Sequence, residues 1–157
     1  MSSGFSQLTA SSKRAKPRGD IFYAAAVPAL LAMILLWPFG GGGTKVQMMA
    51  GTVTPGAQGT IIVHNGTNNN ARLELKVKAL ANPNALTPAE NVYVVWVQPP
   101  DQPAQNQGQL KVNKNEEGAL SFETSYQRFE VFITAEQNAQ VQTPQGPQVL
   151  SADVAAT

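Results

Sequence analysis

The sequence predicts a mainly β protein, in which a single N-terminal transmembrane helix is followed by an antiparallel β-sandwich. One observation behind this prediction is the uncharged run IFYAAAVPALLAMILLWPF at residues 21–39. As a helix this run would span about 28 Å, close to the hydrocarbon thickness of a bilayer. The other observation is a series of short β-prone runs after residue 50, separated by Gly, Asn, Pro and Gln. We therefore expect a membrane anchor and one domain beyond it.

The charges that flank the apolar run predict its orientation. Residues 1–20 form a basic leader with a single acidic residue, Asp20, and four cations: Lys13, Arg14, Lys16 and Arg18. Positive flanks stay in the cytoplasm, and aromatic side chains such as Trp37 and Phe39 favour the headgroup level at the outer end. We therefore expect a bacterial inner-membrane protein with a cytoplasmic N-terminus and a periplasmic C-terminal domain.

Two other interpretations of the run remain open. A cleaved signal peptide would have a shorter apolar core and a small-x-small site close behind it. A buried helix of a globular fold would show an amphipathic period, and this run shows none. Ala25, Ala29 and Ala32 fall near one face of the expected helix, where small residues favour close contact with another membrane helix. Alanines that simply face lipid explain them equally well.

The rest of the chain reads as a short linker and one β domain. Residues 40–50 are expected to be a Gly-rich spacer and first strand, and residues 51–157 the extracytoplasmic sandwich. The expected strands are 60–64, 71–78, 92–97, 109–113, 119–123, 129–134 and 148–152. Strands 109–113 and 119–123 flank a turn and predict a hairpin, whereas 102–109 and 137–147 are expected to be exposed loops.

The aromatic residues of this domain suggest a core and a docking surface. The strand at 92–97 is apolar on both faces, so we expect it to be central. Tyr93 and Trp96 must point to opposite faces, and we place Trp96 in the sandwich core. If the face that carries Tyr93 is open, Tyr93 with Phe132 or Tyr126 would form an aromatic docking patch.

A family resemblance covers about residues 92–150. It rests on Tyr93-Val94-Val95-Trp96, Asn106-x-Gly108-x-Leu110, Leu120 with Thr124, Phe129 with Ile133-Thr134-Ala135-Glu136, and Pro144-x-Gly146-Pro147-x-Val149-Leu150. This pattern resembles the extracytoplasmic domain of anti-sigma-K-factor-like bacterial membrane proteins, and the resemblance implies a membrane-tethered β-sandwich. The twenty residues before the apolar run hold no His or Cys, so we expect no sigma-binding domain there and carry over only the fold from this resemblance.

The residues that usually carry chemistry are sparse. The chain has no cysteine and one histidine, His64, and no nucleophile–base set is recognisable around it. Glu136 occupies the family's Thr-x-Glu position, where we expect a structural hydrogen bond. Residues 40–157 carry seven cations and nine anions with no basic patch in the sequence. We therefore expect a protein that is not an enzyme, with no cofactor, metal site or nucleic-acid partner.

Three functions fit these observations. The leading hypothesis is a non-catalytic accessory or structural subunit of a larger bacterial membrane complex, respiratory or photosynthetic, whose partners are the lipid bilayer and other membrane-protein subunits. The first alternative is an envelope sensor or regulator related to anti-sigma factors. The second is a peptide- or polymer-binding β-module that uses an exposed sheet edge.

Overall fold

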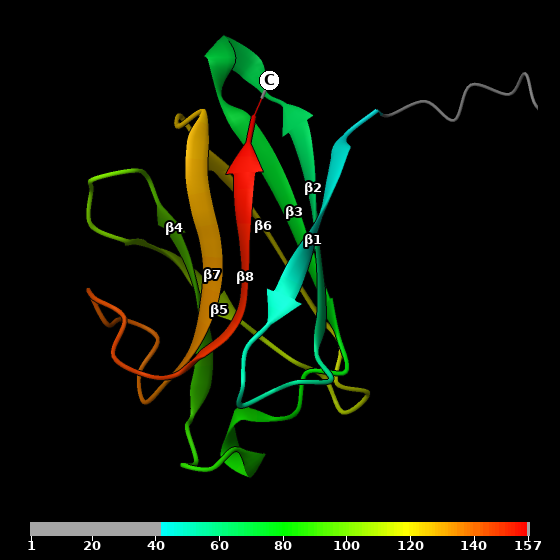
Figure 1. Cartoon of the computed structure of the whole chain (residues 1–157), viewed down its shortest axis with the longest axis vertical. Coiled ribbons are helices and arrows are strands. Elements are labelled where there is room, and N and C mark those ends of the chain that lie inside the picture. The colour runs from blue at the N-terminus through cyan, green and yellow to red at the C-terminus, as the bar shows by residue number, and fades with distance from the viewer. Residues whose placement is uncertain (1–41, 157) are drawn as a thin grey trace, which may run out of the picture. The chain divides into compact units, whose positions relative to one another are not determined.

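The computed structural model describes residues 42–156, which form eight strands and two short 3₁₀ turns (Figure 1). These are β1 (Thr44–Ala50), β2 (Gln58–Asn65), η1 (Thr67–Asn69), β3 (Ala71–Lys78), η2 (Pro83–Ala85), β4 (Val92–Gln98), β5 (Gln105–Leu110), β6 (Gly118–Thr124), β7 (Arg128–Glu136) and β8 (Gln148–Ala155). The prediction of a mainly β domain is confirmed.

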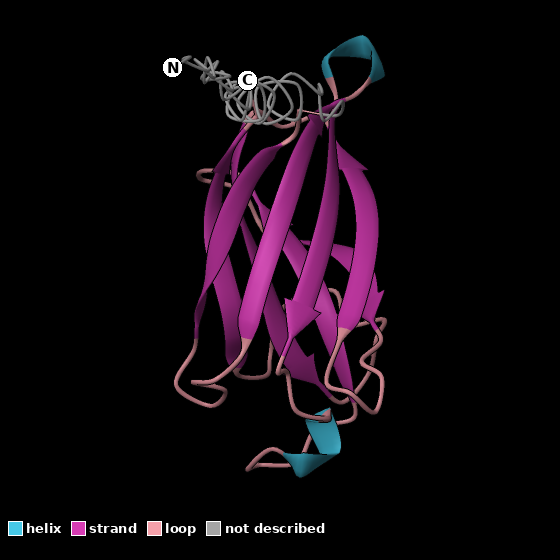
Figure 2. Ribbon diagram, turned by 90° about the vertical axis from the view of Figure 1, so that its right-hand side faces the viewer, coloured by secondary structure: helices cyan, strands magenta, loops and turns pink. Residues whose placement is uncertain are grey.

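The strands form one antiparallel sheet (Figure 2). Their order in the sheet is β5-β4-β7-β8-β1-β2-β3-β6. The two separate sheets of a sandwich are absent from this part of the chain because β1 joins the two halves. Its residues from Thr44 to Met48 pair with β2, whereas Met49 and Ala50 pair with β8. The sheet curls until its edge strands β5 and β6 approach each other, so that it is nearly closed.

The core lies inside this curled sheet and follows from strand periodicity. Leu73, Leu75 and Val77 of β3 are buried, whereas the charged residues between them face outward, with Glu74 half-buried and Lys76 exposed. This strand was predicted from its alternation, and the structure confirms it. Because every strand contributes its inward-facing residues to the same interior, the domain has one continuous main core.

The predicted hairpin between 109–113 and 119–123 is wrong. β6 pairs along its length with β3, and only an isolated bridge between Val112 and Gly118 joins the two segments. The loop predicted at 102–109 is also wrong over most of its length, since β5 begins at Gln105 and pairs with β4. The sequence QNQGQL has little intrinsic strand preference, and here tertiary pairing decides the structure.

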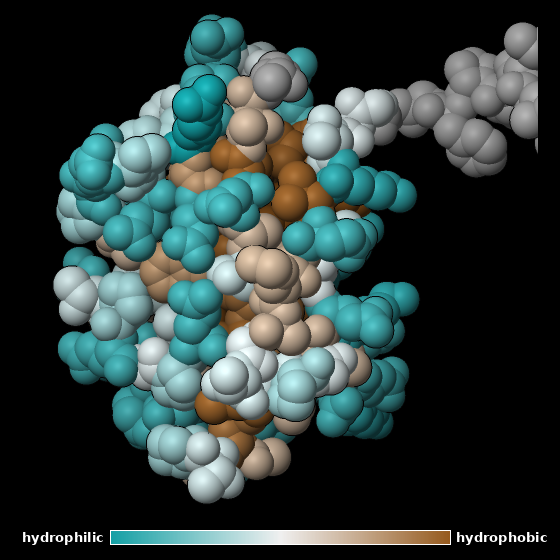
Figure 3. All heavy atoms as spheres, viewed as in Figure 1, coloured by the Kyte–Doolittle hydropathy of each residue, from teal (hydrophilic) through white to brown (hydrophobic). Residues whose placement is uncertain are grey.

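The sheet opens where β1 and β8 separate. Their pairing ends at Met49 and Ser151, and beyond that point each strand has one unpaired edge. Met49 is 72% exposed. Figure 3 shows hydrophobic spheres among hydrophilic ones in the upper half of this face, over the region of the separation.

Within residues 42–156 no helix is long and apolar enough to cross a membrane. The expected span at 21–39 lies outside the described residues. The same holds for the cations, interface aromatics and alanines assigned to the leader and the span: Lys13, Arg14, Lys16, Arg18, Trp37, Phe39, Ala25, Ala29 and Ala32.

Candidate functional site

The two aromatic residues of β4 lie on the opposite faces from those predicted. Tyr93 is in the main core, 1% exposed, and its hydroxyl donates a hydrogen bond to the carbonyl of Ala81 at 2.7 Å. Burial, and to a lesser degree the Glu116 carboxylate, raises the pKa of Tyr93 to about 12, which keeps the hydroxyl a donor at neutral pH. Trp96 is also fully buried, but on the outer face of the sheet. Periodicity could not assign the faces because β4 is apolar on both.

Trp96 forms a second, small core outside the sheet. Its ring stacks on Phe132 of the neighbouring strand β7, with 6.3 Å between ring centroids and 16° between the planes. Ala104 and Val141 pack against this pair, and Val141 belongs to the segment 137–147 between β7 and β8. This segment, predicted to be a plain exposed loop, therefore covers an aromatic cluster on the outer face.

A chain of hydrogen bonds that begins at Trp96 also holds loop 137–147 in place. Trp96 Nε1 donates to Thr134 Oγ1 at 2.8 Å, and Thr134 Oγ1 donates to Glu136 Oε1 at 2.6 Å. The Glu136 carboxylate then accepts the backbone N–H groups of Gln145 and Gly146 at 3.0–3.2 Å. Glu136 is 2% exposed, and these donors satisfy the hydrogen-bonding capacity of its buried carboxyl oxygens. The structural role expected for Glu136 agrees with this geometry.

A second long loop, residues 79–91, is joined to the first one. Asn91 Nδ2 donates to the side-chain and backbone oxygens of Gln137 at 2.9 and 3.1 Å. Gln137 Nε2 in turn donates to Glu90 Oε2 at 2.6 Å, and Glu90 is 8% exposed. We call the loops 79–91 and 137–147 together the distal platform. Its two parts are held by side-chain contacts, so it is a pre-organised surface.

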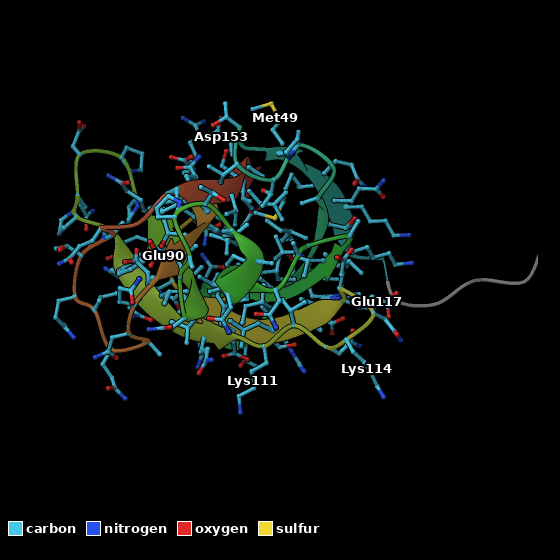
Figure 4. All side chains as sticks on the ribbon, turned by 90° about the horizontal axis from the view of Figure 1, so that it is seen from below. Met49, Glu90, Lys111, Lys114, Glu117 and Asp153 are labelled. Atoms are coloured by element: carbon cyan, nitrogen blue, oxygen red, sulfur yellow. The ribbon has the colours of Figure 1, made fainter. Side chains whose placement is uncertain are left out.

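The distal platform lies at the end of the sheet opposite to the point where β1 begins. Thr44 pairs with Val63 at one end, whereas Lys78, after which the first loop starts, pairs with Gln58 at the other. Figure 4 looks onto the platform end, with Glu90 inside the outline of the molecule. Long loops on a rigid sheet are a common place for recognition.

Gly146 permits the close approach of loop 137–147, called the platform loop below, to β7. A Cβ atom at this position would lie 1.6 Å from the Ala135 carbonyl oxygen. We expect Gly146→Ala to destabilise the domain by about 1–3 kcal/mol, as overpacking does, and to loosen the contact with Glu136. Denaturant unfolding checks this. Gly56→Ala is the control because its Cβ would meet nothing within 4 Å, and an equal effect at both glycines would contradict the close packing.

An acidic pair lies on the outer face of β7 and β8, toward the end of the sheet that is opposite to the platform. Glu130 and Asp153 lie directly opposite each other on β7 and β8, in an open groove of about 510 Å³. Burial, and secondarily the Asp153 carboxylate, raises the pKa of Glu130 above its ordinary value. Gln98 faces Glu130 from β4, and Arg128 lines the same groove.

The raised pKa predicts a pH-dependent stability. The stabilising contribution of neutral Glu130 is present below the pKa of the unfolded state and is lost as pH rises through the folded pKa. We therefore expect Glu130→Gln to stabilise the domain at pH 7 by about 0.2–1 kcal/mol, the usual cost of opposed like charges, and to have no stabilising effect near pH 3. Unfolding midpoints at the two pH values check this, and a larger gain at pH 3 would contradict it.

The predicted docking patch of Tyr93, Tyr126 and Phe132 is not assembled. Tyr93 and Phe132 are 1% and 5% exposed and belong to different hydrophobic clusters on opposite faces of the sheet. Tyr126 is half-buried, and its hydroxyl accepts a hydrogen bond from Gln105 Nε2 at 2.8 Å. The predicted patch does not form because Phe132 lies on the same face of the sheet as Trp96, beneath loop 137–147, whereas Tyr93 lies on the other face.

His64 lies in β2, on the outer face of the sheet. Its Nε2 atom is 3.7 Å from Glu74 Oε1 on the neighbouring strand and makes no hydrogen bond in the described part of the chain. Among residues 42–156 no group of three His, Asp or Glu side chains is placed to hold a metal ion.

Comparisons with protein-family models, with curated proteins and with solved structures find no match for this chain.

Proposed function

We propose that this chain is a non-catalytic accessory subunit of a larger membrane complex in the bacterial cytoplasmic membrane. Its apolar run at 21–39 is the anchor, and its β domain stands in the periplasm. The distal platform is the surface that contacts a neighbouring subunit. The anchor is supported by the length and hydropathy of the run and by its basic flank.

The observation that carries this proposal is the ordering of the platform. Two buried carboxyl groups, that of Glu90 within the platform and that of Glu136 at the end of β7, bind loop groups and hold the loops in place. Loops that are ordered before binding lose less conformational entropy when a partner docks. The use of these carboxylates as structural acceptors supports a binding surface more than a site of acid–base chemistry.

The composition of the platform indicates the kind of partner surface. Its two loops hold a single charged residue, the buried Glu90, and otherwise consist of Asn, Gln, Thr, Pro, Gly, Ala, Leu and Val. A neutral surface of this kind matches a neutral, polar partner surface. Because no exposed charge contributes, we expect the contact to persist when the salt concentration is raised.

Purification of the full chain from native membranes in mild detergent, followed by mass spectrometry, tests the proposal. We expect stoichiometric membrane-protein partners that are lost in Ala85→Arg, an exposed position in the platform. Ser121→Arg places the same charge on the exposed face of β6, opposite Glu74 in the middle of β3 and outside the platform, and is the matched control. A chain that elutes without partners, or equal losses in both variants, would overturn the proposal. A co-purified sigma factor would favour the sensor alternative.

A further inference from the structure

A groove lies between the start of β5 and the platform loop 137–147. It has a volume of about 500 Å³ and is lined by Ala104, Gln105, Asn106, Ala139, Gln140 and Gln142. This volume is within the range of about 300–1,000 Å³ that is usual for small-molecule sites. The lining consists of four amide side chains and two methyl groups, with no charged residue among them.

Asn106 fixes the two sides of the groove relative to each other. Its Nδ2 atom donates to the carbonyls of Ala139 and Val141 at 3.0 and 2.9 Å, and its Oδ1 atom accepts the N–H of Gly108 at 2.8 Å. All hydrogen-bonding groups of this amide are thus engaged between β5 and the platform loop. The hydrogen bonds of Asn106 therefore hold the two sides of the groove in a fixed position.

Other amides of the lining keep hydrogen-bonding capacity. Gln105 uses its Nε2 atom on the Tyr126 hydroxyl, and Gln142 uses its Nε2 atom on the Gln140 carbonyl, so both amide oxygens remain available. The side-chain amide of Gln140 makes no hydrogen bond to any residue between 42 and 156. Uncharged donors and acceptors side by side suit hydroxyl groups, which both donate and accept.

The edge of β5 argues against an extended peptide as the ligand. Val95 pairs with Gly108 and Trp96 with Asn106, so Gln107 is an extra residue in a bulge, and Gly108 has a φ of 118°. A bulge of this kind interrupts the row of backbone groups that an added strand would pair with. The groove remains accessible to a ligand that binds through its own hydroxyl groups.

We propose that this groove binds a neutral saccharide, such as an uncharged stretch of an envelope glycan. The amide oxygens of Gln105 and Gln142 accept from sugar hydroxyls, and the Gln140 amide donates and accepts. Ala104 and Ala139 provide apolar contact for a sugar ring. Such binding would tether the domain to a polymer, in addition to any contact with a protein subunit.

Titration of the purified full chain in mild detergent with chitotetraose, cellotetraose and maltotetraose tests this inference. We expect saturable binding of at least one of the three, weakened at least tenfold in the double variant Gln140→Ala/Gln142→Ala. The matched control is Gln58→Ala/Gln148→Ala, which removes two exposed amides outside the groove. Unfolding midpoints of both variants are measured alongside, and we expect them to be unchanged.

Several outcomes would overturn the inference. These are no binding of any of the three saccharides, an equal loss in the control variant, and binding of an uncharged ten-residue peptide in place of the saccharides. The proposed accessory function is tested separately by Ala85→Arg, which lies in the platform but outside the lining of the groove. We expect Ala85→Arg to bind the saccharide as the unchanged chain does and to lose its co-purified membrane partners.

Discussion

Replacement of Trp96 by alanine is expected to lower the free energy of unfolding by about 3–5 kcal/mol, as for other large buried aromatic residues. The side chain is 0% exposed and stacks on Phe132. Its loss also removes the N–H that donates to Thr134 and the surface on which Val141 rests. We expect the platform loop to become more mobile as a result. Denaturant unfolding of the full chain in mild detergent, followed by far-ultraviolet circular dichroism, measures the change.

Two further variants show where this effect originates. Trp96→Phe keeps an aromatic ring against Phe132 but loses the donor, so its cost should be well below that of alanine. Ser121→Ala changes an exposed residue of β6 and should have an effect within about 0.5 kcal/mol. A loss of less than about 1 kcal/mol in Trp96→Ala would mean that the outer cluster contributes little to folding, and the covering role of the platform loop would be contradicted.

Arginine at Leu30 or Leu35 is expected to prevent stable membrane insertion. Both residues lie inside the apolar run, and a charge at the centre of a transmembrane helix costs about 2.5–3.5 kcal/mol on insertion scales. The chain should then be found in the aqueous fraction or be degraded. Fractionation of cells and an alkaline wash of the membranes, followed by immunoblotting, measure the distribution.

Conservative substitutions provide the control for this experiment. Leu30→Ile and Leu35→Phe keep the run apolar and should leave the chain in the washed membranes. If both arginine variants also stay there, the run is not the anchor. The anchor assignment would then have to be abandoned, and with it the placement of the domain outside the cytoplasm.

The parts of the fold that could be predicted are those with a local pattern. The alternation in β3 gave both its bounds and its buried face, since one side of that strand packs inward and the other meets water. β4 was recognised as a central strand, but its buried faces could not be ranked because both are apolar. β5 was missed because its amide-rich sequence is typical of a loop, and pairing with β4 makes it a strand.

The candidate site was less accessible to sequence analysis for a similar reason. Glu136 was identified as a structural acceptor through the Thr-x-Glu pattern, and its hydrogen bonds are formed with residues close in sequence. The contact between Asn91 and Gln137 joins residues 46 positions apart. No local motif encodes such a pair. The platform and the amide groove depend on contacts of this long-range kind, so they emerge only from the folded structure.

The central claim, that a membrane anchor holds this β domain outside the cytoplasm, is tested most directly by cysteine labelling. The chain has no native cysteine, so single cysteines introduced by Ser6→Cys in the leader and Ser125→Cys in an exposed turn report each side alone. In intact spheroplasts, a membrane-impermeant maleimide should label the cysteine at 125, and the cysteine at 6 only after the membrane is permeabilised. Labelling at 6 with protection at 125, or a mature chain that lacks residues 1–39, would contradict the account.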